Sequence, residues 1–168
     1  MILLVAAVLE GPSATAPVVG CARRIEGGRP IAASFPGDVT IGPIRFTGLR
    51  SAATADPKEI TPRRGHRWAV VKAAPVAEAG APVTVVVAAA DRPHLRVAWA
   101  GGSGIAATFV PCAPGTPAFS YRGTVGERTA WAGGFFIDGP GCRHIEVWVK
   151  GRARPLTRTI SFGAGTCR

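Results

Sequence analysis

The sequence predicts an all-β fold, an antiparallel β-sandwich that is Ig-like in general plan. Apolar and polar residues alternate in short runs, most clearly over 95–99 and 145–149. Glycine- and proline-containing turns separate such runs, roughly every 8–12 residues, as is typical of sandwiches. No stretch keeps a helical period over three turns. A small β-barrel is the alternative fold.

The expected strands can be placed from these runs and from the turn residues between them. A broken strand over 39–46 is interrupted at Gly42-Pro43, because proline cannot donate to a strand ladder. The segment 49–62 is expected to be a connection with one short helical turn, and 101–104 a flexible loop. The other expected strands cover 68–73, 83–90, 95–99, 106–110, 129–137 with a kink at the two glycines, 145–149 and 156–162.

Length and apolar content indicate one folded domain preceded by an N-terminal segment. The chain has 168 residues, of which 47% are hydrophobic. We expect an apolar leader or truncated anchor over 1–20, an irregular segment over 21–38, and the sandwich domain over 39–168.

The N-terminal residues favour export, and several signals remain open. Met1–Leu9 is apolar but shorter than the about 20 residues that span a bilayer. Ala14–Ala16 has the small-x-small pattern of a signal-peptide cleavage site, whereas Val18–Cys21 resembles a lipobox with Cys21 as the lipidated residue. The third interpretation is that the sequence starts too late and that a longer leader or membrane anchor has lost its beginning.

Four cysteines, Cys21, Cys112, Cys142 and Cys167, predict two disulfides and therefore an oxidising compartment. They contain no C-x-x-C spacing, which disfavours a redox or zinc-ribbon motif. We expect the pairs Cys112–Cys142 and Cys21–Cys167, because chain termini of a sandwich often lie close together. The pair Cys142–Cys167 is the main alternative, since these residues flank consecutive strands.

The net charge of +10 favours contact with polyanions, and seventeen of the 20 basic residues are arginine. The strongest candidate is an anion-binding loop with Arg63, Arg64, His66 and Arg67, next to Trp68. Two further clusters are Arg92, His94 and Arg96, and then Arg152, Arg154 and Arg158. If the loops share one end of the sandwich, they form one anion-binding surface; otherwise they are solvated turn residues.

No catalytic, metal or cofactor motif is evident. Gly101–Ile105 approaches the G-x-S-x-G pattern but lacks its closing glycine and does not stand at a strand-to-helix turn. The three histidines have no metal-ligand spacing. We therefore expect no metal, no cofactor and no catalytic residues.

The C-terminal half carries four short motifs: F-V-P-C at 109–112, A-G-G-F at 132–135, P-G-C at 140–142 and S-F-G-A-G-T-C at 161–167. With these motifs the chain resembles a group of uncharacterised exported or membrane-tethered proteins of actinobacteria. The resemblance covers roughly 41–168 and implies export and a disulfide-bonded β domain, without implying an activity.

Together these features predict a non-catalytic exported module at the bacterial cell envelope. It would be secreted or tethered to the cell membrane and would have a binding or structural role towards an anionic cell-wall or lipid component. A secreted hydrolase with a site built from distant loop residues is the alternative. Nucleic acid is disfavoured as a partner, since the basic residues are not interleaved with stacking aromatics.

Overall fold

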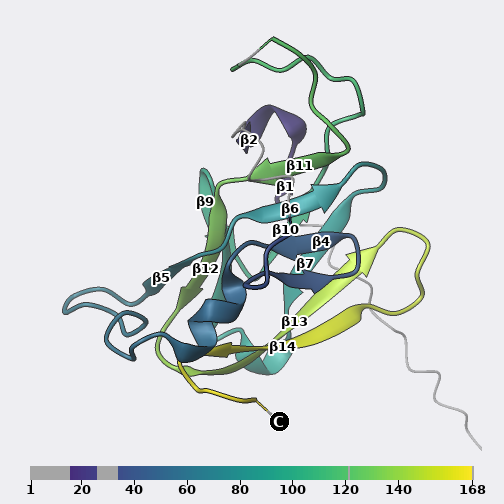
Figure 1. The fold of residues 1–168 in the computed structure, drawn as a ribbon. Coiled ribbons are helices and arrows are strands. Elements are labelled where there is room, and N and C mark those ends of the chain that lie inside the picture. The colour runs from purple at the N-terminus through teal and green to yellow at the C-terminus, as the bar shows by residue number, and fades with distance from the viewer. Residues whose placement is uncertain (1–15, 26–33, 121, 168) are drawn as a thin grey trace, which may run out of the picture.

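The computed structural model describes residues 16–25, 34–120 and 122–167, and it is mostly β (Figure 1). Three open sheets are formed, and among the described strands every neighbouring pair except β1 with β10 is antiparallel. The predicted β-rich, mostly antiparallel character is confirmed. The alternative of a small barrel is wrong, because these sheets do not close. Of the predicted leader, residues 1–15 lie outside the described residues.

Each sheet combines strands from distant parts of the chain. Sheet A consists, in spatial order, of β1 (Val18–Val19), β10 (Ala106–Phe109), β7 (Val83–Val87), β13 (Gly141–Val149) and β14 (Leu156–Phe162). Sheet B consists of β2 (Arg24–Ile25), β11 (Arg128–Trp131), β6 (Pro75–Glu78), β4 (Ile44–Phe46) and β3 (Val39–Ile41). Sheet C consists of β5 (Ala69–Lys72), β12 (Gly133–Ile137), β8 (Leu95–Trp99) and β9 (Gly102–Gly104). The short 3-10 helices are η1 (Cys21–Arg23), η3 (Leu49–Thr54) and η4 (Ala89–Asp91).

The long strand predicted over 129–137 is in fact two strands in different sheets. The chain leaves sheet B after Trp131 and enters sheet C at Gly133, with Ala132 between them. Glycine is needed here: Gly134 has φ 152°, and a Cβ atom at this position would lie 2.0 Å from the carbonyl oxygen of Val71. The glycines therefore let the chain change sheets instead of merely bending one strand.

Other differences from the expected elements have local causes. The stretch 101–104, expected to be a flexible loop, forms edge strand β9, because it pairs with β8 through Ser103 and Ala98. Strands β1 and β2 fall in segments predicted as leader and irregular chain. The expected helical turn in 49–62 is confirmed as η3, and strands β8 and β14 have the predicted bounds.

The core of the molecule is continuous across all three sheets, and Phe135 of β12 lies at their junction. Its ring centroid is 5.1 Å from that of Phe46 in sheet B and 5.8 Å from that of Phe162 in sheet A. All three side chains are fully buried. Such aromatic contacts stabilise beyond the apolar area that they bury, so Phe135 couples the packing of the three sheets.

Two disulfides are present, as predicted, but the predicted pairing is wrong. The bonds are Cys21–Cys112 and Cys142–Cys167. Strands β10 and β13 both pair antiparallel with β7 and therefore run in the same direction, so Cys112, after the end of β10, and Cys142, near the start of β13, lie at opposite ends of sheet A. The alternative pair Cys142–Cys167 forms because β14 runs antiparallel along β13. The segment that follows β14 therefore lies beside the start of β13.

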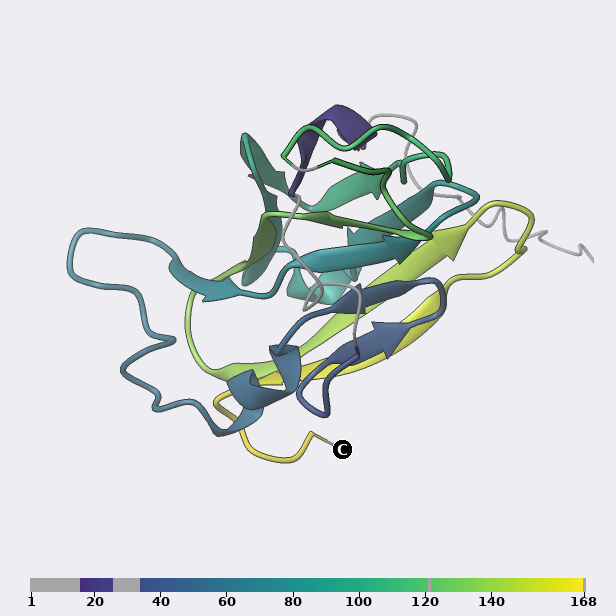
Figure 2. The ribbon, with the colours of Figure 1, turned by 45° about the horizontal axis from the view of Figure 1, so that its top comes forward.

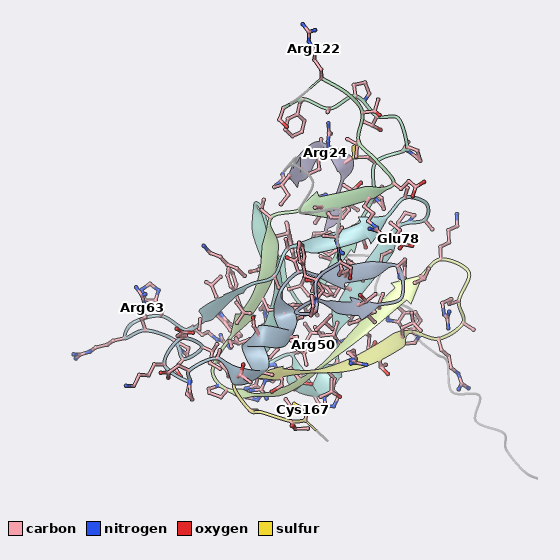
Figure 3. All side chains as sticks on the ribbon, in the orientation of Figure 1. Arg24, Arg50, Arg63, Glu78, Arg122 and Cys167 are labelled. Carbon is pink, nitrogen blue, oxygen red and sulfur yellow. A yellow bond between two sulfur atoms is a disulfide. The ribbon has the colours of Figure 1, made fainter. Side chains whose placement is uncertain are left out.

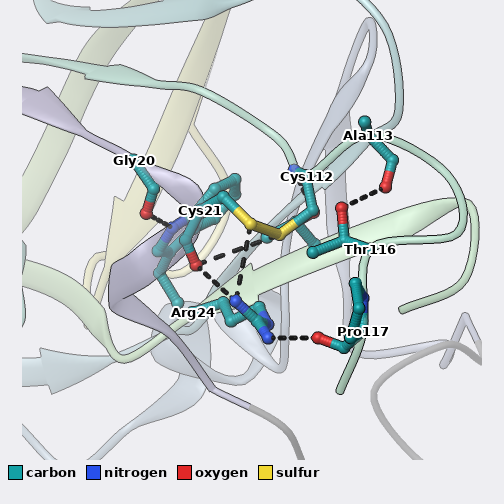
Figure 4. Close-up of a disulfide and its surroundings, with 9 residues drawn as sticks. Gly20, Cys21, Arg24, Cys112, Ala113, Thr116 and Pro117 are labelled. Carbon is teal, nitrogen blue, oxygen red and sulfur yellow. Dashed lines mark hydrogen bonds between the residues drawn. A yellow bond between two sulfur atoms is a disulfide. The ribbon is translucent and has the colours of Figure 1, made fainter. Parts of the chain in front are cut away.

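The bond between Cys21 and Cys112 follows from the parallel pairing of β1 with β10, in which Val19 lies opposite Phe109. Arg24 covers this disulfide and donates hydrogen bonds to the carbonyl oxygens of Cys21 and Pro117 (Figure 4). A sulfur engaged in a disulfide cannot carry a lipid thioether, so this bond contradicts the lipobox interpretation of Cys21. On the chain-entropy model the two bonds stabilise the fold by about 4.6 and about 3.5 kcal/mol, since they close loops of 91 and 25 residues.

Replacing Phe135 with alanine should lower the free energy of unfolding by about 3–5 kcal/mol, because the substitution opens a cavity where the three sheets meet. Guanidinium chloride denaturation of the oxidised protein measures this loss. The control is Val70→Ala on the exposed side of the same sheet, for which we expect less than about 1 kcal/mol. Equal losses in the two variants would contradict the central position of Phe135.

Candidate functional site

The segment 55–68, here called the basic loop, projects from the body of the molecule between η3 and β5 (Figures 1 and 2). Buried Ile60 anchors it to the core. Its tip is a turn in which the amide of His66 donates to the carbonyl oxygen of Arg63 at 2.9 Å, and Gly65 has φ 84°. All four predicted anion-binding residues, Arg63, Arg64, His66 and Arg67, are exposed on this loop.

Trp68, at the end of the basic loop, brings two of the predicted arginine clusters together. The guanidinium carbon of Arg67 lies 4.9 Å from the centroid of the indole ring, and that of Arg96 lies 5.2 Å from it. Arg96 also donates to the carbonyl oxygens of Arg92 and Leu95, which hold its side chain along β8. Cation–π contacts of this kind orient guanidinium groups without consuming their hydrogen-bond donors.

A hollow of about 350 Å³ lies at the base of the loop. Its lining combines basic, hydroxyl and aromatic side chains with one carboxylate, that of Glu59. The lining residues are Lys58, Glu59, Thr61, Arg63, His66, Trp68, Ala69 and Val70.

The cations in and beside this hollow form the basic surface, defined as Lys58, Arg63, Arg64, Arg67, Lys72 and Arg96. Within the described ranges, none of them is in an ion pair. Four carboxylates pair elsewhere: Asp38 with Arg45, Glu78 with Arg128, and both Asp91 and Asp138 with Arg143. The positive charge of the basic surface is therefore available to a ligand.

The third arginine cluster lies elsewhere. Arg152 and Arg154 are in the turn between β13 and β14, on the opposite side of the molecule from the basic loop in both ribbon views (Figures 1 and 2). Arg158 lies on β14 opposite Ile145. The structure thus joins two of the three predicted clusters and separates the third.

Two His–Asp pairs flank Arg143 at the start of β13. Nδ1 of His94 is 2.7 Å from Oδ2 of Asp138, and Nδ1 of His144 is 2.8 Å from Oδ2 of Asp91. Arg143 bridges the two carboxylates at 3.5 and 3.9 Å. A carboxylate and the imidazole that it orients are two of the three groups of a hydrolytic triad, and the third is a nucleophilic hydroxyl or thiol. No hydroxyl or thiol is hydrogen-bonded to either ring in the part of the chain that the structure describes.

The residue singled out from the near-match to G-x-S-x-G, Ser103, lies in edge strand β9 opposite Ala98. It does not stand at a strand-to-helix turn, which the nucleophile elbow requires. Over 16–25, 34–120 and 122–167, His, Cys, Asp and Glu side chains form no group of three or more that could hold a metal ion.

Sequence reasoning missed the surface that continues the hollow along sheet C. Every second residue from 68 to 72, that is Trp68, Val70 and Lys72, lies on the same side of β5 and of the residue before it. Phe136 of β12 pairs with Val70 on one side and with Arg96 on the other. The period of two at 68–72 could have predicted that these three side chains share one side of the strand. The proximity of Phe136 could not have been predicted from the sequence, because it depends on the order of strands in the sheet.

The chain finds no match among protein-family models, curated proteins or solved structures. None of the helices among the described residues is long and apolar enough to cross a bilayer. Function is therefore inferred from the geometry of the basic surface.

Double-mutant cycles should show that Trp68 is coupled to Arg67 and to Arg96 by about 0.5–1 kcal/mol each, as expected for exposed cation–π pairs. The cycles combine Trp68→Ala with Arg67→Ala or Arg96→Ala, and chemical denaturation gives the unfolding free energies. A cycle with Arg63→Ala is the control and should show no coupling. Coupling energies near zero for Arg67 and Arg96 would contradict the observed stacking.

Proposed function

We propose that this chain is a non-catalytic, exported β-sandwich module, Ig-like in general plan, that acts at the bacterial cell envelope. It binds an anionic surface component, a cell-wall phosphate polymer or a lipid headgroup, through the basic surface. The proposal is supported by the guanidinium and ammonium groups that gather around one hollow and one indole ring and that have no ion-pair partner among the described residues.

The chemistry of the basic surface fits a multivalent oxyanion. Arginine presents several N–H donors in a fixed plane and binds phosphate or carboxylate bidentately. Arg67 and Arg96 are oriented by Trp68, so less side-chain entropy is lost when an anion binds. Arg63 lies on the projecting loop (Figure 3) and lines the hollow together with Lys58.

Export is supported by the two disulfides, which require an oxidising compartment. The resemblance to exported and membrane-tethered actinobacterial proteins points the same way. An N-terminal tether to the membrane would bring the basic surface to anionic envelope components at a high local concentration.

A secreted hydrolase is the second candidate, and the two His–Asp pairs are the observation that favours it. Asp91 is buried and also accepts the backbone amide of His144 at 2.7 Å. The same contacts join η4 to β13, so a purely structural role explains them equally well. Binding is the better supported function, because no hydroxyl or thiol is hydrogen-bonded to either imidazole among the described residues.

The double variant Arg63→Ala/Arg64→Ala should bind anionic envelope material about tenfold or more weakly, because two phosphate contacts are lost. Its affinity should also depend less on salt, since fewer exposed charges take part. Cosedimentation with phosphatidylglycerol vesicles and with purified cell walls, each at several salt concentrations, measures both effects.

The matched control is Arg152→Ala/Arg154→Ala, which removes the same two charges from the net +10 at the remote hairpin. It should retain most of the affinity. Equal weakening in both double variants would show that net charge, and not the basic surface, drives binding.

A further inference from the structure

The outer face of sheet C continues the hollow at the basic loop as an apolar depression. This second hollow, of about 570 Å³, is lined mainly by small and apolar residues, among them Ala98, Gly134 and Phe136, and also by Thr47 and Lys72. Val70 lines both hollows, so the two adjoin. Gly134 lines this hollow without a side chain, and a Cβ atom there would collide with the carbonyl oxygen of Val71. From the first hollow to the second, the lining therefore changes from mainly basic and polar to mainly apolar, with Lys72 as the cation of the second hollow.

Val70 is the residue at which the two regions meet, and its side chain is exposed. Its relative exposure is 57%, and it stands between Trp68 and Lys72 on the same side of β5. Phe136, its cross-strand neighbour, is half-buried. Apolar side chains that line a hollow on a protein surface are a common mark of a binding site.

Charge complementarity limits what can occupy both regions. A hydrophilic polyanion would pair with the basic surface and leave the apolar hollow in water. A neutral lipid would fill the hollow and leave the cations unpaired. Both regions are satisfied by an amphiphilic anion whose charged head lies at Arg63 and Lys58 and whose hydrocarbon part lies on Val70 and Phe136.

We propose that the site binds an anionic phospholipid, with the phosphate group at the basic loop and an acyl chain along the hollow between Val70, Ala98 and Phe136. The inference rests on the proposed function and names its ligand class. It makes Val70 and Phe136 determinants of lipid binding.

The test uses the full oxidised protein and soluble short-chain phosphatidylglycerol below its micelle concentration, followed by isothermal titration calorimetry. Inorganic polyphosphate is the head-only probe, short-chain phosphatidylcholine is the neutral probe, and a Glu-rich peptide with Leu and Phe residues represents a protein partner. The variant Val70→Ser/Phe136→Ser should bind phosphatidylglycerol about tenfold more weakly, since apolar contact is lost on two side chains. Its affinity for polyphosphate should not change, which also shows that the variant is folded.

Two controls separate the apolar contact from general effects. Val70→Leu should retain lipid affinity, and Val18→Ser, at another exposed valine in β1, should leave it unchanged. The inference is overturned if Val70→Ser/Phe136→Ser binds the lipid as the unmodified protein does. It is also overturned if the acidic peptide binds and the lipid does not.

These outcomes differ from failure of the proposed function. If Arg63→Ala/Arg64→Ala weakens polyphosphate binding while the apolar substitutions have no effect on lipid, the site binds anions without an acyl chain. If Arg63→Ala/Arg64→Ala affects neither ligand, the proposed function itself is wrong.

Discussion

The contact of Phe135 with Phe46 and Phe162 is the interaction on which the arrangement of the three sheets depends. It places β12 in the middle of the molecule, so that successive residues of one strand serve two purposes. Phe135 points into the core, and Phe136 contributes to the outer surface of sheet C. The same strand that holds the fold together therefore also positions Val70 and Arg96, its neighbours in register, beside Trp68.

The disulfides secure the periphery of this arrangement. One joins the region of β1 and η1 to the chain that leaves β10, and the other joins the start of β13 to the segment after β14. The second region is tied to η3 as well, since Gly163 donates a backbone hydrogen bond to Ala52 at 2.6 Å. Because η3 leads directly into the basic loop, the loop starts from an anchored helix and ends in a paired strand.

Sequence alone predicted what depends on local pattern and could not predict what depends on strand order. Alternation located β8 and the second half of β13, and the even cysteine count indicated two disulfides. The pairing was missed because it depends on the parallel contact of β1 with β10, and neither strand length nor spacing signals such a contact. The convergence of Arg67 and Arg96 on one indole has the same origin: the residues are distant in sequence and meet only because β5 and β8 both pair with β12.

Seventeen arginines raise the question whether binding is a property of the basic surface or of the whole chain. Two-dimensional NMR of arginine side-chain Nε–Hε groups, during titration with short-chain phosphatidylglycerol, answers it residue by residue. We predict shift changes that saturate at Arg63, Arg67 and Arg96, with little change at Arg152 and Arg154. Small, unsaturated changes spread over all arginines would contradict a specific site.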